Sequence, residues 1–287
     1  MQALFGQLLV GLINGSFYAL LSLGLSVIFG LVGVVNFAHG ALYTTGAFVA
    51  WLGLTVLGVG YWPALLLTPL AVGLLGVVVE RTMLRRIYAL DDLYGLLLTY
   101  GLTLVIEGLF HHFYGNSGNG YPVPEALAGG TNLGFMFLPR YRAWVVVASL
   151  AVCGASWWVI ERTKLGAYLR AGTENPRLLQ AFGVDVPLMI TLTVGFGAGL
   201  AGLAGVMAAP IYQVSPSMGS SLVIVVFAVV VIGGMGSILG SIVTGLGLGL
   251  LEGLTKFLYP EAAATVVFAV MALVLLARPA GLFGREP

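Results

Sequence analysis

Residues 6–30, GQLLVGLINGSFYALLSLGLSVIFG, contain no charged side chain, and this stretch decides the fold of the chain. The hydrocarbon core of a bilayer is about 30 Å thick, so a helix needs roughly 20 apolar residues to cross it. Similar stretches recur from Phe5 to Ala277, and charged residues make up 8% of the chain, against roughly a quarter in soluble domains. The sequence therefore predicts an all-α, polytopic transmembrane helical bundle.

The apolar segments predict about eight to nine spans, with broken or re-entrant helices, in one transmembrane domain over residues 1–287. The approximate segments are 6–30, 39–60, 62–80, 93–113, 142–160, 188–209, 219–234, 237–256 and 261–277. Segment 219–234 is short for a full crossing, so we expect a half-helix that dips into the membrane. The 42 glycines suit close helix contacts and broken helices, which are common in transporters.

Lys and Arg are unevenly distributed among the loops, and cytoplasmic loops carry the excess of these residues. Segment 161–187 holds four basic residues. The loop after residue 80 and the C-terminal tail are also basic, with Arg81, Arg85, Arg86, Arg278 and Arg285. Segment 114–141 has one basic residue, Arg140, and is rich in Gly, Asn and Pro. We therefore expect 161–187 and the tail to be cytoplasmic and 114–141 to be external. A nine-span count puts the N-terminus outside, whereas an eight-span count leaves its side open.

Motifs of common enzymes and metal sites are missing from the sequence. It has no GxxxxGK[ST] phosphate loop, so the chain does not hydrolyse ATP by a Walker mechanism. It has no HExxH and no Cys/His cluster that would suggest a metal site. The net charge of +1 argues against a nucleic-acid partner. We therefore expect a protein that is not an enzyme and carries no cofactor or metal.

The segment Val34–Gly40, VVNFAHG, places Asn36 and His39 between two apolar stretches. Polar side chains are costly in lipid, so they are candidates for a pathway. One interpretation is a broken helix whose freed backbone and side chains line a cavity. The other, which the residues alone favour, is an ordinary polar loop between two spans. A faint repeat links this region to 233–246, because Gly33, Gly40 and Thr44 recur as Gly233, Gly240 and Thr244.

Segment 161–187, ERTKLGAYLRAGTENPRLLQAFGVDVP, is far longer than a hairpin needs. Asn175 followed by Pro176 is typical of a helix N-cap and first helical residue, and Gly183 is typical of the glycine that ends a helix. We expect one apolar face on this short helix, formed by Leu178, Leu179 and Phe182. An amphipathic element on the lipid surface and a docking piece for another protein are both possible, and the capped design favours docking.

At this loop the chain resembles a known family. LRAGTENPRLLQAFGVDV (169–186) is similar to the EAA-type coupling loop of ABC importer permeases, although it lacks the first letters of a strict EAA motif. LSLGLSVIFGLVGVVNFAHGALYTTGAF (21–48) is similar to the first conserved block of branched-chain amino acid permeases of the LivH type. IGGMGSILGSIVTG (232–245) and RPAGLFGRE (278–286) are similar to two further blocks of that family.

The resemblance implies a permease subunit of an ATP-driven importer that moves branched-chain or related amino acids across a bacterial inner membrane. The implied partners are a second homologous permease, two cytoplasmic ATPase subunits, a periplasmic substrate-binding protein, the small-molecule substrate and membrane lipid. The implied ATPase-coupling residues are Ala171, Gly172, Glu174, Asn175, Pro176, Leu179 and Gly183. The implied substrate-pathway residues are Asn36, Phe37, His39 and Gly40.

Other functions stay open at this point. Importers of urea and short amides share these sequence blocks. An ion-coupled secondary transporter would work without partner subunits but needs a deeply buried carboxylate, for which Glu107, near the outer end of its span, is the candidate. A channel is disfavoured, because the sequence shows no ring of charges and no filter-like segment.

Overall fold

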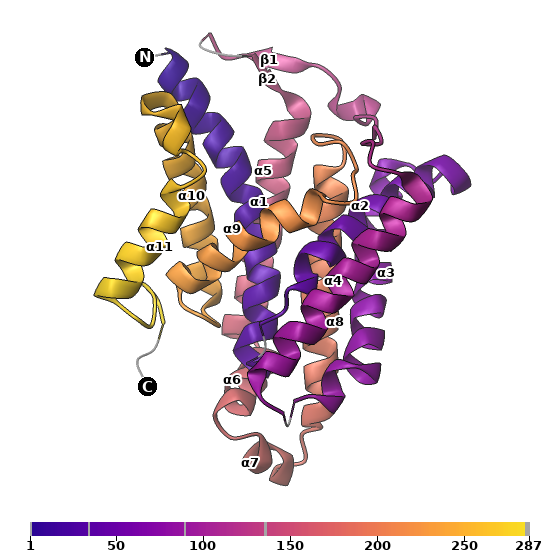
Figure 1. Ribbon diagram of the computed structural model, residues 1–287, viewed down its shortest axis with the longest axis vertical. Helices are drawn as coiled ribbons and strands as arrows, with labels where there is room; N and C mark the ends of the chain where they lie inside the picture. Colours follow the sequence, from indigo (N-terminus) through magenta and orange to yellow (C-terminus); the bar gives the residue numbers. More distant parts are fainter. Residues whose placement is uncertain (1, 34, 89, 135–136, 285–287) are drawn as a thin grey trace. The chain divides into compact units, whose positions relative to one another are not determined.

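The computed structural model describes residues 2–33, 35–88, 90–134 and 137–284 (Figure 1). This part of the chain is mostly helical, which confirms the all-α fold class. Its elements are α1 (Gln2–Val32), α2 (Ala38–Leu57), α3 (Tyr61–Thr82), η1 (Leu84–Arg86), α4 (Asp92–Tyr114), η2 (Glu125–Leu127), β1 (Gly130–Asn132), β2 (Phe137–Pro139), α5 (Arg140–Arg162), α6 (Lys164–Glu174), α7 (Pro176–Ala181), α8 (Val186–Ala208), α9 (Met218–Gly233), α10 (Ile238–Leu258), η3 (Pro260–Ala262) and α11 (Val266–Ala277). The strands β1 and β2 pair antiparallel as a small hairpin. Arg285, expected with the basic tail, lies outside the described residues.

Within the described residues, seven helices are long and apolar enough to cross a membrane, namely α1, α2, α3 with η1, α4, α5, α8 and α10. The helices α9 and α11 are also apolar but have 16 and 12 residues. At 1.5 Å per residue they are about 24 Å and 18 Å long, which is less than the thickness of the hydrocarbon core. The short length of α9 agrees with the expected half-helix. Helix α11 is shorter than the expected apolar segment 261–277.

The chain divides into two compact units, each assembled from separated segments. Unit 1 consists of Met1–Leu23, Pro122–Cys153 and Ile224–Pro287, and unit 2 consists of Gly24–Tyr121 and Gly154–Val223. The units interleave along the sequence, and the single-domain boundary of 1–287 stays a prediction.

In unit 1, α1 and α10 run antiparallel with their backbones in close contact. A Cβ on Gly249 would collide with the backbone of Gly15, and a Cβ on Gly253 would collide with the carbonyl of Gln7. Across the same interface the Tyr18 hydroxyl donates a 2.8 Å hydrogen bond to Glu252. Small residues let helices approach this closely in a membrane. The start of α1 therefore lies beside the end of α10 (Figure 1).

The described part of the tail folds back onto the end of α9, also in unit 1. The Leu282 N–H donates to the carbonyl of Ile232 (2.8 Å), and the Phe283 N–H donates to that of Gly233 (3.2 Å). These bonds satisfy carbonyls that have no partner inside the helix at its C-terminus. Helix α10 begins next to this turn and ends beside the start of α1. The tail and the start of α1 therefore lie at opposite ends of unit 1.

In unit 2, the largely buried helix α8 packs against both α2 and α3. Gly46 on α2 lies against Gly202 on α8, and Gly73 on α3 lies against Gly195 on α8. Backbone meets backbone at these crossings, as expected for helices that associate through small residues. The interface between α3 and α8 is consequently tight, with few large side chains interlocking along it.

Candidate functional site

The helical path of unit 2 is broken between α1 and α2. Helix α1 ends before Gly33, whose φ of +70° is a left-handed conformation that favours glycine. Helix α2 begins at Ala38, and just before it the Asn36 Oδ1 accepts a 3.1 Å hydrogen bond from the Ala38 N–H. The break thus has a defined stop and a defined restart.

Helix α4 holds the residues of this break in place. The Thr99 hydroxyl oxygen accepts a 3.2 Å hydrogen bond from the Phe37 N–H and lies 3.3 Å from the carbonyl oxygen of Val35. The Phe37 ring also packs edge-on against Tyr100, with 6.2 Å between centroids. Backbone groups released from helical bonding are therefore met by a neighbouring helix, which is how broken helices are tolerated at membrane depth.

The polar side chains of the break are buried. Asn36 is 4% exposed and His39 is 1% exposed. A Cβ on Gly24 of α1 would lie 3.0 Å from Cε1 of His39, and Gly40 lies against Gly219 at the start of α9. The segment is a short connection between two helices, as a loop would be, but these two polar side chains lie inside the packed helices. The assignment of Asn36, Phe37, His39 and Gly40 to a substrate pathway stays a prediction.

The glycine-rich segment between α9 and α10 has a similar local design. Gly234 and Gly236 take positive φ angles of +97° and +81°. Helix α10 then begins at Ile238, and the Ser237 hydroxyl caps it by accepting a 3.1 Å hydrogen bond from the Gly240 N–H. Both segments thus place a left-handed glycine before the next helix, but Gly233, which matches Gly33 in the faint sequence repeat, is the last residue of α9.

Helices α6 and α7 form a small helical pair, here called the knob, which is visible at the bottom of Figure 1. The Asn175 Oδ1 accepts a 2.9 Å hydrogen bond from the Leu178 N–H, and Pro176 is the first residue of α7. Gly183 follows with a φ of +83°. The expected short helix, its Asn-Pro start and its glycine stop are confirmed.

The apolar side chains of α7 do not share one face. Leu179 is 7% exposed, whereas Phe182 is 78% exposed and Leu178 is also exposed. A Cβ on Gly172 of α6 would lie 3.5 Å from Cδ2 of Leu179. The expectation of one apolar face formed by all three residues is therefore wrong, because Leu179 packs inside the knob and holds its two helices together.

The knob rests on the last turn of α1 and the first turns of α8. A Cβ on Gly172 would lie 2.6 Å from Cε of Met189 on α8 and 3.5 Å from Cδ1 of Leu31 on α1. Asp185 caps α8, because its Oδ1 accepts a 3.0 Å hydrogen bond from the Leu188 N–H. A shift of the knob would therefore press directly on α8 and on the end of α1 that leads into the helix break.

The remaining predicted coupling residues lie on the surface of the knob. Ala171 and Glu174 are exposed near the end of α6, and Asn175 and Pro176 are exposed at the start of α7. On α6, the Arg170 guanidinium donates a 2.9 Å hydrogen bond to the carbonyl of Ile160, which ties the knob to the end of α5. The structure thus brings the predicted coupling residues into one element, while their role in docking stays a prediction.

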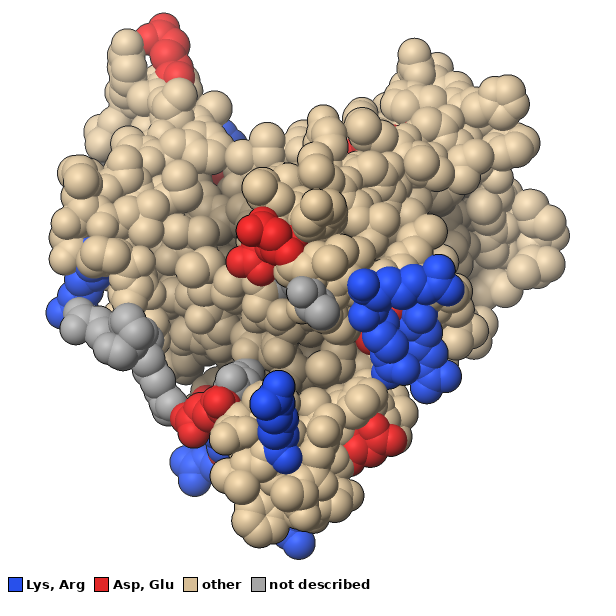
Figure 2. Space-filling view, turned by 60° about the horizontal axis from the view of Figure 1, so that its bottom comes forward, with Lys and Arg blue, Asp and Glu red and all other residues tan. Residues whose placement is uncertain are grey.

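Basic residues are concentrated at the same end of unit 2. They come from the end of α3, from η1, from the end of α5 and from the knob, and they are Arg81, Arg85, Arg86, Arg162, Lys164, Arg170 and Arg177. Figure 2 views the molecule from the knob side and shows basic side chains around a largely uncharged surface. This is the distribution that the excess of Lys and Arg in the loops led us to expect.

One buried carboxylate was missed by the sequence analysis. Glu80, in the last turn of α3, has no exposed side-chain surface, whereas Glu107 on α4 is only half buried. In the sequence, Glu80 lies next to Arg81 at the end of an apolar stretch, where a charged residue usually faces water. In the part of the chain that the structure describes, no group of three or more His, Cys, Asp or Glu residues could hold a metal ion.

Comparisons with known proteins agree over nearly the whole chain. The family model described as "Branched-chain amino acid transport system / permease component" matches residues 7–276. The high-affinity branched-chain amino acid transport system permease protein BraD of Pseudomonas aeruginosa is 29% identical, over 97% of this chain and 95% of the relative. The corresponding protein LivH of Escherichia coli is 28% identical with the same coverage.

A more distant relative is the probable branched-chain amino acid transport permease protein LivH of Methanocaldococcus jannaschii, which is 25% identical over 96% of this chain and 91% of its own length. No solved structure matches this chain. The family model spans the helix break, the knob and both short helices. The chain therefore belongs to the family of permease components of branched-chain amino acid transport systems.

Proposed function

We propose that this chain is a translocation subunit of an ATP-driven importer of branched-chain or related amino acids in a bacterial inner membrane. In the proposed complex it pairs with a second homologous permease. Two cytoplasmic ATPase subunits hydrolyse ATP, and a periplasmic binding protein delivers the substrate. The names of the relatives support the substrate class and the role as a permease. The subunit composition is our inference.

The observation that carries the proposal is the knob. It exposes Leu178 and Phe182, while Leu179 holds its two helices together and Gly172 packs against Met189 and Leu31 of the neighbouring helices. An exposed aromatic side chain on a rigid element is the kind of group that dominates binding energy at protein interfaces. A partner that grips this element would act on the ends of α1 and α8, and through α1 on the helix break.

The sidedness follows from the excess of basic residues. If the basic end of unit 2 faces the cytoplasm, the knob is on the side where ATP is available. In unit 1, the tail that follows Arg278 lies at the opposite end from the start of α1. With the tail in the cytoplasm, the N-terminus faces the periplasm, which is also the side expected for the β1–β2 hairpin.

The structure supplies little support for the ion-coupled alternative. The fully buried carboxylate of Glu80 already faces the Arg85 guanidinium at 3.5 Å and accepts a 2.6 Å hydrogen bond from Thr191. The Arg85 guanidinium already neutralises this carboxylate, in the place that a transported cation would occupy at an ion-coupling site. We therefore place Glu80 in the framework of the permease and keep ATP as the energy source of the proposal.

The docking role is tested by Phe182→Ala, with Gln180→Ala as the matched control on the same helix. Both residues are exposed on or next to α7, but only Phe182 offers a large apolar surface. The permease is co-expressed with the ATPases encoded beside it, and the amount of ATPase that copurifies is measured. We expect Phe182→Ala to weaken the association by about 1–2 kcal/mol and Gln180→Ala to leave it unchanged. Equal ATPase recovery with both variants would contradict docking through this face.

The substrate class is tested separately with the binding protein of the same operon. Titration with leucine, isoleucine, valine, urea and short amides gives a dissociation constant for each. We expect the branched-chain amino acids to bind most tightly. Selective binding of urea or an amide would keep the importer mechanism but replace the substrate.

A further inference from the structure

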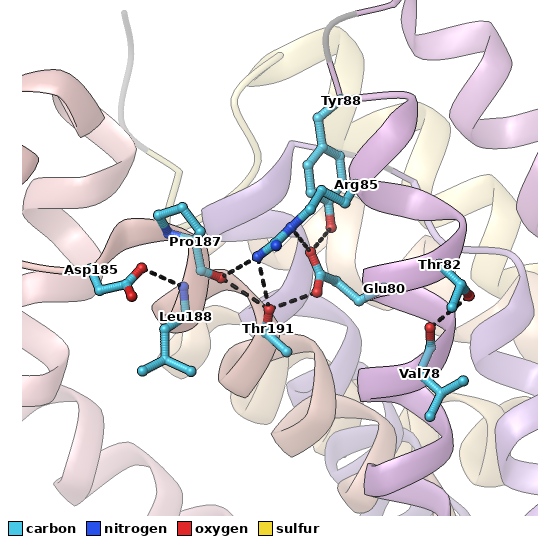
Figure 3. Close-up of polar contacts among 9 residues, drawn as sticks. All are labelled: Val78, Glu80, Thr82, Arg85, Tyr88, Asp185, Pro187, Leu188 and Thr191. Carbon is cyan, nitrogen blue, oxygen red and sulfur yellow. Dashed lines mark hydrogen bonds and ion pairs between the residues drawn. The ribbon is translucent and has the colours of Figure 1, made fainter.

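The Glu80 carboxylate lies at the centre of a group of polar contacts, here called the Glu80 cluster, that consists of Glu80, Arg85, Tyr88 and Thr191 (Figure 3). The Arg85 Nε lies 3.5 Å from Oε1 of Glu80, and the Tyr88 hydroxyl lies 3.5 Å from the same oxygen. The Thr191 hydroxyl donates a 2.6 Å hydrogen bond to Oε2. One carboxylate thus joins α3, the segment after it, and α8.

Arg85 connects Glu80 to α8 by a second route. Its Nη2 donates to the carbonyl oxygen of Pro187 (3.3 Å) and lies 3.4 Å from Oγ1 of Thr191. Figure 3 shows the guanidinium between the carboxylate on one side and the start of α8 on the other. Arg85 is therefore positioned as a bridge, and a planar, multi-donor guanidinium suits that geometry better than an ammonium group does.

Apolar side chains pack against the Tyr88 end of the cluster. Ile28, Leu84 and Val194 are buried next to it, and the residues packed against these three are Val32, Val79, Ile87, Tyr88, Leu98 and Ile190. Burial raises the pKa of the Tyr88 hydroxyl above its usual value, and the neighbouring Glu80 charge raises it further. Tyr88 therefore stays protonated and can donate to the carboxylate. The Glu80 charge is costly to desolvate, whereas Arg85 is 45% exposed, and an ion pair with a solvent-exposed partner adds little to stability.

An ion pair that adds little stability is best explained by what it positions. Below the Glu80 cluster, α3 and α8 meet through Gly73, Gly76, Gly195 and Gly199. These backbone contacts hold the helices close, and Val72 and Val77 of α3 fit against Gly202 and Gly195 of α8. Because apolar packing is non-directional, a directional restraint on sliding or rotation of one helix along the other must come from hydrogen bonds. The directional bonds from Glu80 and Arg85 to Thr191 and Pro187 supply that restraint.

The first turns of α8 lie between this cluster and the knob. Met189 packs on the knob at Gly172, and Thr191, two residues further along the same helix, bonds to Glu80. We infer that Glu80, Arg85 and Thr191 are positioning residues that lock α8 to α3, so that a movement of the knob is passed to α3 instead of being lost as sliding of α8. This inference rests on the proposed function, since it assigns a task to the cluster within ATP-driven transport.

The test uses the whole complex in proteoliposomes and measures the number of substrate molecules imported per ATP hydrolysed. Thr191→Val removes the hydroxyl that joins α8 to Glu80, and Thr191→Ser restores it. Thr193→Val is the matched control, because the Thr193 hydroxyl bonds to the Met189 carbonyl of its own helix (2.8 Å). We expect Thr191→Val to keep ATP hydrolysis while its import per ATP falls about fivefold or more, within the usual range of coupling factors. The Thr191→Ser and Thr193→Val complexes should keep the parental ratio.

A merely structural role would lower the amount of assembled complex and reduce import and hydrolysis together, leaving their ratio unchanged. A parental ratio for Thr191→Val overturns the inference. If Thr191→Val does not assemble, Arg85→Lys decides, because it keeps the positive charge but loses the bridge. A lowered ratio supports the inference, whereas a parental ratio or a second failure to assemble overturns it. Failure of the unmutated complex to couple import to ATP would instead contradict the proposed function itself.

Discussion

At the scale of single residues, Asn36 is where the predicted link between the helix break and transport can be tested. Its side chain accepts a hydrogen bond from the Ala38 N–H, it is almost fully buried, and the backbone on either side of it is held by Thr99 of α4. A zwitterionic substrate that crosses the membrane needs hydrogen-bonding partners where water is excluded. We predict that the Asn36 amide is one such partner.

We predict that Asn36→Ala lowers the maximal rate of uptake and leaves the substrate concentration for half-maximal uptake nearly unchanged. The substitution removes the hydrogen bond that the Ala38 N–H donates to the side chain, whereas the unmutated binding protein sets the apparent affinity. Asn36→Asp keeps an accepting oxygen and should retain more of the rate. Initial rates over a range of substrate concentrations measure both parameters. If Asn36→Ala transports at the parental rate with parental expression, the break has no part in the pathway.

At the scale of the helices, close glycine contacts explain why α1 and α10 lie backbone to backbone. The matched positions on α10 are Gly249, which faces the backbone of Gly15, and Gly247, which faces open space. A methyl group at the first position must push the helices apart, while a methyl group at the second meets nothing. The two substitutions therefore separate helix packing from helix propensity.

We predict that Gly249→Ala lowers stability by about 1–3 kcal/mol, as overpacking usually does, and that Gly247→Ala is neutral or slightly stabilising because Ala is the better helix former. Thermal unfolding of the detergent-solubilised protein, followed by far-UV circular dichroism, provides the comparison. Equal melting temperatures for the two variants would show that α1 and α10 are not in the contact described.

Sequence patterns within a few residues predicted the helices well, whereas contacts between residues far apart in the chain could not be predicted. The Asn-Pro start and Gly183 stop of α7 are readable because a cap and a left-handed glycine act within a few residues. The inward direction of Leu179 is not readable, because it depends on Gly172 of another helix. The burial and hydrogen bonding of Glu80 could not be predicted either, since its partner Thr191 is 111 positions away in the chain.

At the scale of the whole molecule, the topology follows from the basic end of unit 2 and from the fold of unit 1. We predict that a cysteine at Arg177 is labelled from the cytoplasm, whereas cysteines at Ala3 and Ala126 are labelled from the periplasm. The single native cysteine, Cys153, is buried and can be replaced by alanine as the background. Accessibility to a membrane-impermeant maleimide, in intact cells and in inverted vesicles, tells the two sides apart. Labelling of Ala3→Cys from the cytoplasmic side would contradict the assigned orientation.

The central claim joins this topology to an energy source. The chain provides the membrane path, and separate ATPases gripping the knob provide the energy. An ion-coupled transporter with the same helices would need no such partner. The two accounts therefore differ in what must be added to the purified permease before substrate accumulates.

The most direct test is uptake of radiolabelled leucine into proteoliposomes that contain the complete complex. ATP is placed on the side of the knob, and the binding protein is placed on the opposite side. The account predicts accumulation that requires ATP, the ATPases and the binding protein together, and that Phe182→Ala reduces. Accumulation by the permease alone under an ion gradient, without ATPases or binding protein, would contradict it.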